Sequence, residues 1–183
     1  HMHADQTHGI KDLRVFFIKR RETIPIYADK NTKKYLSKAF SYCFKNSNRE
    51  YPAILKMNLI KDNFLIKNGN KSINVKSVKV QHGKVDSMCY IFDKKLAYIS
   101  DVSKIHKKDY KFFKKLKYLI IDCLWYKNHP SHLNLEQSLE LIKIFSPKKA
   151  ILTNLHSEFD YKILKSKLPK NIVPAYDGLK LYF

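Results

Sequence analysis

Four side chains that can bind a metal ion lie within the first eight positions of the chain: His1, His3, Asp5 and His8. In an extended segment alternate residues point the same way, so His1 and His3 can converge on one ion. Asp5 can then reach a neighbouring position, and imidazole and carboxylate groups are ordinary ligands of divalent metals. The alternative is that His1-Met2 is a remnant of cloning, which leaves one natural histidine in the pair. The spacing alone supports both interpretations.

The elements that must position this cluster follow from hydrophobic periodicity. We expect helices over 9–22, from Asn31 or Thr32 to 44, near 109–116, over 134–145 and near 160–168. We expect strands over 24–28, 64–66, 75–80, 89–92, 96–99, 118–123, 150–153 and near 179–182. Strands that are dense at first and then alternate with helices indicate an α/β sandwich. Because no low-complexity linker is visible, we expect a single domain over residues 1–183.

Composition excludes several classes of protein. The chain has 183 residues, and 44% of them are hydrophobic, which is enough apolar surface for a core and excludes wholesale disorder. No apolar run reaches membrane-spanning length and no signal peptide is visible, so we expect no membrane partner. Cys43, Cys89 and Cys123 are scattered and odd in number. They favour a reducing, cytoplasmic compartment over a disulfide scaffold.

The formal net charge of +20 has two interpretations. Of the 36 basic residues only Arg14, Arg20, Arg21 and Arg49 are arginines, although arginine is the better residue for bidentate phosphate contacts. Lysine and the abundant Asn, Ile, Tyr and Phe all have AT-rich codons, so one interpretation is a compositional bias dispersed over solvated surface. The other is a surface that attracts an anionic substrate or nucleic acid. The two are compatible, and we expect dispersed charge without a single groove.

The opening segment resembles the HxHxDHxxG motif of the metallo-β-lactamase fold, and residues 9–14 are similar to the HGIDDLR sequence of one branch. That branch contains the phosphoribosyl cyclic phosphate phosphodiesterases, and the tRNA 3′-processing nucleases are more distant relatives. Further matching stretches follow in order at 81–83, 98–102, 129–133, 151–156, 168–169 and 175–179. The resemblance covers essentially the whole chain and implies an αββα metallo-β-lactamase-like sandwich. The family carries several strands before its metal motif, so we expect a sandwich that lacks its N-terminal strands.

The resemblance also implies a ligand set. It assigns His1, His3 and His82 to a first metal ion, Asp101 to a bridging position, and Asp5 to a second ion. The implied cofactors are therefore one or two divalent metal ions, Zn²⁺ or Mn²⁺.

Two positions depart from the family pattern, and both belong to the second metal. A histidine that follows the aspartate of the motif is Gln6 here, and a late histidine ligand is Asn154. Amide and carboxylate oxygens suit harder ions such as Mn²⁺ or Mg²⁺ better than Zn²⁺. The second site is then weak, differently populated, or repaired by a nearby imidazole, for which His8 and His156 are the candidates.

The resemblance implies a phosphodiesterase in which Asp5 orients the attacking hydroxide and His132 gives a proton to the leaving oxygen. We expect His132 to face the metal ligands from across the cavity, beyond coordination distance; the alternative is a helix-entry histidine bonded to backbone. Asp122 is either a buried support for the site or simply the end of a strand. The expected substrate is a small cyclic ribose phosphate or a nucleotide-like phosphodiester. The alternatives are an RNA-processing nuclease, which the charge favours, and a non-catalytic binding paralogue with an impaired second site. The sequence gives no signal for the oligomeric state.

Overall fold

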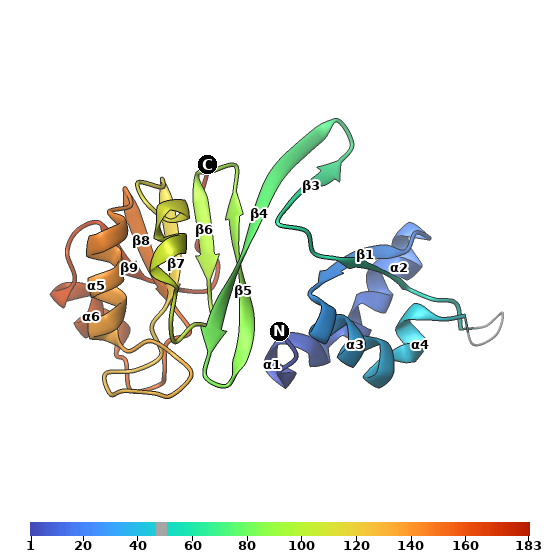
Figure 1. Ribbon diagram of the computed structural model, residues 1–183, viewed down its shortest axis with the longest axis horizontal. Helices are drawn as coiled ribbons and strands as arrows, with labels where there is room; N and C mark the ends of the chain where they lie inside the picture. Colours follow the sequence, from blue (N-terminus) through green and yellow to red (C-terminus); the bar gives the residue numbers. More distant parts are fainter. Residues whose placement is uncertain (47–50) are drawn as a thin grey trace. The chain divides into compact units, whose positions relative to one another are not determined.

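A computed structural model describes residues 1–46 and 51–183 of the protein (Figure 1). The chain forms two compact units, residues 1–61 and residues 62–183. Both contain helices and strands, so the predicted mixed α/β class is confirmed. The assignment of both units to a single domain stays a prediction. Within the described residues, no helix is long and apolar enough to span a membrane.

The first unit contains short helices around two parallel strands. Its elements are α1 (Ala4–Thr7), η1 (His8–Leu13), α2 (Arg14–Arg20), β1 (Ile24–Ala28), α3 (Lys30–Ala39), α4 (Ser41–Phe44) and β2 (Leu55–Leu59). Strands β1 and β2 pair in parallel, with Ile24 opposite Leu55. The predicted strand 24–28 is confirmed to the residue, and the predicted helix 9–22 corresponds to η1 and α2. Strand β2 was not predicted.

The predicted start of the second helix is wrong by a few residues. Its N-cap is Asp29, not Asn31 or Thr32. The Asp29 carboxylate accepts hydrogen bonds from the backbone N–H groups of Asn31, at 2.9 Å, and of Thr32, at 3.3 Å. It also accepts one from the Thr32 hydroxyl. A carboxylate that satisfies two first-turn donors is a strong helix start, and Asp29 therefore fixes where α3 begins.

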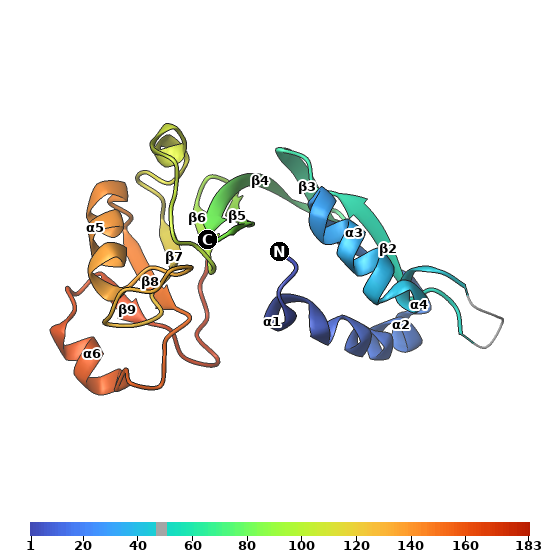
Figure 2. The same ribbon diagram turned by 60° about the horizontal axis from the view of Figure 1, so that its bottom comes forward.

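The second unit is built on one seven-stranded sheet. Its elements are β3 (Asn63–Asn68), β4 (Lys71–His82), β5 (Val85–Phe92), β6 (Leu96–Ile99), η2 (Lys107–Phe112), β7 (Tyr118–Asp122), α5 (Leu135–Phe145), β8 (Lys149–Thr153), α6 (Tyr161–Lys167) and β9 (Ile172–Pro174). The strands follow one another in sequence order across the sheet. Pairs from β3 to β6 are antiparallel, and pairs from β6 to β9 are parallel. Helices α5 and α6 lie beside the parallel part of the sheet (Figures 1 and 2).

This topology brings four strand ends to one edge. Strand β4 is antiparallel to β5, and β5 is antiparallel to β6, so β4 and β6 run in the same direction as the parallel strands β7 and β8. The carboxyl ends of all four strands therefore meet at the same edge, which is where α/β sheets place their ligand-binding residues. His82 and Asp122 are the last residues of β4 and β7, and Asp101 and Asn154 follow β6 and β8 closely.

Two other predicted elements differ from the structure. Residues 179–182 form no strand, and the last strand is β9, Ile172–Pro174. Pro174 weakens the strand signal because it cannot donate to a ladder, but β9 is an edge strand, where proline is tolerated. The helix expected near 109–116 is a 3₁₀ helix over Lys107–Phe112. The helix expected over 134–145 is confirmed as α5, with a capping box in which Asn134 and Gln137 satisfy each other's backbone N–H groups.

Candidate metal centre

Three ligand-type side chains gather at the carboxyl edge of the second unit. One donor atom each from His82, Asp101 and His132 lies within 4.8 Å of the other two. His82 and Asp101 are each only 3% exposed. Polar side chains are buried this deeply when something satisfies them. The hydrogen bonds of each residue therefore decide what the cluster can do.

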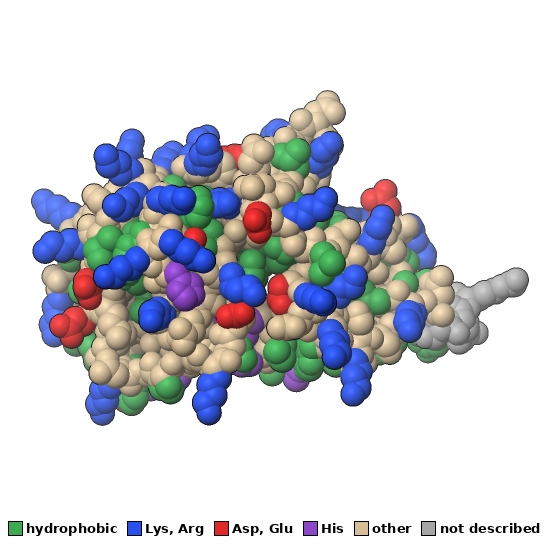
Figure 3. All heavy atoms as spheres, in the orientation of Figure 1, with side chains coloured by type: hydrophobic (Ala, Val, Ile, Leu, Met, Phe, Trp, Pro, Cys, Tyr) green, Lys and Arg blue, Asp and Glu red, His purple; other side chains and the backbone are tan. Residues whose placement is uncertain are grey.

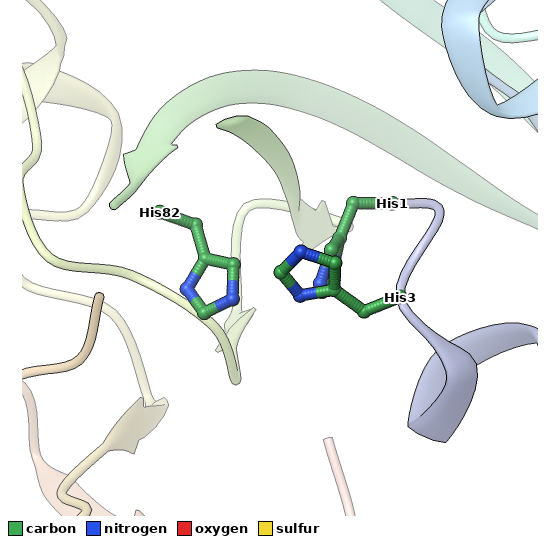
Figure 4. A group of neighbouring side chains, drawn as sticks. All are labelled: His1, His3 and His82. Carbon is green, nitrogen blue, oxygen red and sulfur yellow. The ribbon is translucent and has the colours of Figure 1, made fainter. Parts of the chain in front are cut away.

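His82 has its tautomer fixed by a main-chain carbonyl. Its Nδ1 lies 2.6 Å from the carbonyl oxygen of Ser131, which can only accept a hydrogen bond. Nδ1 therefore carries the proton, and in the neutral ring Nε2 presents its lone pair. This is the form that a metal-binding histidine requires. Figure 4 shows the His82 ring at the end of β4.

His132 is held in the same manner by a carboxylate. Its Nδ1 lies 2.8 Å from Oδ2 of Asp122, which is fully buried. Burial raises the pKa of the Asp122 carboxyl, while the hydrogen bond and charge of His132 and the backbone N–H of Val102 act against that rise. The rings of His132 and His82 meet edge to face, with centroids 4.7 Å apart. Asp122 is thus both the last residue of β7 and a hydrogen-bond partner of His132, which fits both interpretations of this residue.

Asp101 and Asn154 complete this edge. The hydroxyl of Ser100 donates to Oδ2 of Asp101 at 2.5 Å. The side-chain nitrogen of Asn154 donates to the carbonyl of Ser100, at 3.1 Å, and to Oδ1 of Asp122, at 3.3 Å. Asn154 has a φ of 65°, a left-handed conformation that asparagine tolerates better than most residues. Its amide therefore belongs to the network that surrounds Asp122.

In the first unit the predicted ligands lie on a short segment at the start of the chain. The rings of His1 and His3 meet edge to face, with centroids 4.4 Å apart (Figure 4). The segment is extended only up to His3, because α1 begins at Ala4. Asp5 lies in the first turn of α1. The side-chain nitrogen of Gln6 donates to Oδ2 of Asp5 at 3.2 Å, and both residues are exposed.

The two candidate repair ligands are engaged elsewhere. Nε2 of His8 lies 3.3 Å from the Tyr35 hydroxyl. Nδ1 of His156 accepts a hydrogen bond from the backbone N–H of Glu158 at 3.2 Å, and its ring lies against Trp125.

His132 lies nearer to His82 and Asp101 than the expected position across a cavity, because its bond to Asp122 draws the ring toward the sheet edge. The Nδ1 atom of His132 bonds to a carboxylate, whereas the alternative interpretation expected a bond to the backbone.

Sequence reasoning named Asp122 but missed the groups that contact His82 and Asp101. Ser131 acts through its main-chain carbonyl, which every residue has, so no residue type could have revealed it. Ser100 carries a signal only in its position directly before Asp101. His82 and Asp101 offer an imidazole with a fixed tautomer and a carboxylate, which fit a divalent metal ion in chemistry, and His132 lies near enough to them to act either as a ligand or as a proton donor.

Basic side chains do not gather around one groove on the face shown in Figure 3. Lysines and arginines are scattered over that face among acidic and apolar side chains. On this face the charge is dispersed, as predicted.

Comparison with known proteins relates most of the chain to one superfamily. The family model described as "Beta-lactamase superfamily domain" matches residues 1–154. A diphosphatase from the PhnP family has a crystal structure that is 27% identical, with a TM-score of 0.86, and the match covers 99% of this chain and 67% of that chain. The short form of human tRNase Z is 14% identical with a TM-score of 0.65, over 98% of this chain and 75% of that one, and shows the fold alone.

One curated relative is a much longer protein. The chain is 26% identical to a protein named octanoyltransferase from Porphyromonas gingivalis (strain ATCC BAA-308 / W83). The match covers 98% of this chain but 36% of that protein. The chain therefore spans about a third of the length of the relative that it matches.

Proposed function

The chain belongs to the β-lactamase superfamily, and on this basis we propose that it is a metal-dependent hydrolase of phosphodiesters. The proposed substrate is a small cyclic ribose phosphate or a nucleotide-like phosphodiester. The observation that carries the proposal is the pair of histidines at the carboxyl edge of the sheet, His82 and His132. The Nδ1 atom of each is bonded to an oxygen acceptor, and both lie beside Asp101. The similarity to a diphosphatase of the PhnP family supports phosphoryl chemistry.

The proposed ligands are those implied by the family motif. His1, His3, His82 and Asp101 would hold a first divalent ion, and Asp5 would serve a second. A divalent ion supplies Lewis acidity toward the phosphoryl oxygens and the attacking water. The Zn²⁺ or Mn²⁺ choice depends on the second site, where the amides of Gln6 and Asn154 favour the harder ion.

His132 and Asp5 have the proposed proton-handling roles. When His132 is protonated, its Nδ1–H stays on the Asp122 carboxylate and its Nε2–H is available to the departing alkoxide. The buried Asp122 carboxylate stabilises that imidazolium by charge and by hydrogen bonding. Asp5, whose carboxylate is exposed, accepts a hydrogen bond from the attacking water and orients it.

Two other functions have specific support. The charge of +20 and the fold of tRNase Z favour an RNA-processing nuclease. The amides at positions 6 and 154 favour a binding paralogue with an impaired second site.

The three free, buried cysteines fit a protein of a reducing, cytoplasmic compartment.

Turnover of two substrates at increasing salt tests the proposal. We expect the protein loaded with Zn²⁺ or Mn²⁺ to hydrolyse a ribose 1,2-cyclic phosphate at a rate that changes little with salt. An RNA with a 3′ extension, if it were the substrate, would be cleaved with a steep loss between low and high salt, because phosphate contacts release counterions. Cleavage of the RNA alone would replace the proposal by the nuclease. No turnover of either by metal-loaded protein would favour the binding paralogue.

A further inference from the structure

The turn after β4 touches the loop that carries His132. Gly83 has a φ of +60°, and a Cβ built on it would lie 2.9 Å from Cβ of Ser131, 3.4 Å from its Cα and 3.7 Å from the carbonyl oxygen of Pro130. A Cβ atom does not approach another carbon atom to 2.9 Å, so any residue other than glycine would force one of the two segments to move.

The Gly83 side of this contact is fixed. The backbone N–H of Gly83 donates to the hydroxyl of Ser103 at 3.1 Å, and its carbonyl accepts the side-chain amide of Gln81 at 3.2 Å. Ser103 in turn donates its backbone N–H to the carbonyl of Gln81 at 2.8 Å. Because two of these bonds tie the turn to Ser103 and the third closes the turn itself, we expect a clash at Gly83 to be relieved by displacing Ser131.

Ser131 lies between the two histidines of the site. Its carbonyl accepts the Nδ1–H of His82 at 2.6 Å, and the next residue, His132, donates to Asp122 at 2.8 Å. A shift of Ser131 by even half an ångström would stretch the bond to His82 and change the 4.7 Å spacing of the two rings. The absence of a side chain at Gly83 therefore permits the hydrogen bond between His82 and the Ser131 carbonyl.

We propose that Gly83 is a positioning residue: its lack of a side chain lets the Ser131 carbonyl reach Nδ1 of His82, which fixes the tautomer of His82 and its spacing from His132. The inference rests on the proposed function only in taking His82 as a metal ligand. Gly83 touches no substrate and no metal, and acts through Ser131.

The chain contains a matched control for this proposal. Gly69 has a φ of +57°, but a Cβ built on it meets no atom within 4 Å. Gly83→Ala and Gly69→Ala therefore impose the same unfavourable backbone conformation, and only Gly83→Ala adds the contact with Ser131. A rescue variant is available as well, because Ser131→Gly removes the opposing Cβ and keeps the main-chain carbonyl.

The test measures the His82 tautomer and the affinity for Zn²⁺ in the full chain. Ring ¹⁵N chemical shifts, recorded above the ordinary pKa of imidazole, report which nitrogen carries the proton. Competition with a chromophoric chelator reports the Zn²⁺ affinity. For Gly83→Ala we expect His82 to lose its single tautomer and Zn²⁺ affinity to fall about 10–100-fold, as when a supporting hydrogen bond of a metal ligand is removed. Gly69→Ala keeps both properties, and Gly83→Ala with Ser131→Gly regains them.

The outcomes separate the inference from the proposed function. Equal tautomers and equal affinities in the two alanine variants would overturn the inference, as would a double variant that fails to recover. If Gly83→Ala does not fold, a double variant that folds with the native tautomer supports the inference, and one that does not fold overturns it. Failure of the wild-type protein to hydrolyse phosphodiesters would remove the proposed function but leave the tautomer comparison intact.

Discussion

The site residues at the carboxyl edge of the second unit are buried and hydrogen-bonded, whereas Asp5 and Gln6 in the first unit are exposed. Asp122 and His82 are buried, and each of His82 and His132 has an oxygen acceptor on Nδ1. The hydrogen bond between Gln6 and Asp5 joins neighbours in sequence and ties neither residue to another element. The difference teaches that the fold preorganises the predicted site residues of the second unit, while Asp5 and Gln6 keep exposed side chains. Substitutions of these second-unit residues should alter stability and function together.

The largest expected effect is that of His132→Ala. Loss of a general acid lowers kcat by roughly 10²–10⁴-fold, and most strongly for poor leaving groups. The metal content should stay that of the wild type, because His132 is proposed to face the leaving oxygen. Steady-state kinetics with good and poor leaving groups and elemental analysis check both parts. Loss of metal in this variant would make His132 a ligand, a role that its distance from His82 and Asp101 allows.

A pair of carboxylate substitutions compares the two regions directly. Asp122→Asn places an amide where the backbone N–H of Val102 and Nδ1–H of His132 both need an acceptor. We expect unfolding free energy to fall by about 1–3 kcal/mol and activity to fall about 10–100-fold. Asp5→Asn is exposed and should change the unfolding free energy by less than about 0.5 kcal/mol while lowering activity. Equal stability losses in urea unfolding would remove the distinction between the regions.

The parts of the two units also differ in how well the sequence predicts them. Strands that are short, mainly apolar runs, such as β1 and β6, were predicted to the residue, because such a run is itself the sequence signal of a strand. The strand containing Pro174 was missed, because its edge position, which tolerates proline, is set by the sheet and not by local sequence. The motif residues His82 and Asp101 were predicted as ligands, and both are buried beside His132. The carbonyl of Ser131 has no sequence signature, so the tautomer of His82 could only come from the structure.

Cysteine reactivity offers a probe of how rigid each unit is. Burial raises the pKa of the Cys123 thiol to about 12 and that of Cys89 well above its ordinary value, and it raises the pKa of Cys43 too. Only the thiolate reacts, so all three should resist an aromatic disulfide reagent in the native protein at pH 8. Cys43 belongs to a much smaller buried cluster than the other two, and we expect it to react roughly tenfold faster through local opening. Faster labelling of Cys89 or Cys123 would contradict this.

The smallest predicted effect concerns the cap of α3. Burial opposes ionisation of Asp29, but hydrogen bonds from the Thr32 hydroxyl and the first-turn N–H groups outweigh it and lower the pKa of the carboxyl. Because the folded pKa lies below the unfolded one, this stabilisation is present above the ordinary pKa and is lost as pH falls through the lowered value. Asp29→Ala should cost about 1 kcal/mol at pH 7 and less at about pH 2 to 3. Urea unfolding at both pH values checks this, and an equal cost at both would exclude the charged cap.

The most direct test of the proposed metal-dependent hydrolase is to strip the protein of metal and follow hydrolysis of a ribose cyclic phosphate while Zn²⁺ or Mn²⁺ is returned in known amounts. We predict no turnover without metal, a rate that rises in proportion to the bound ion, and saturation at about one or two ions per chain. Full turnover by the stripped protein, or tight binding of the ion with no turnover at saturation, would contradict the account.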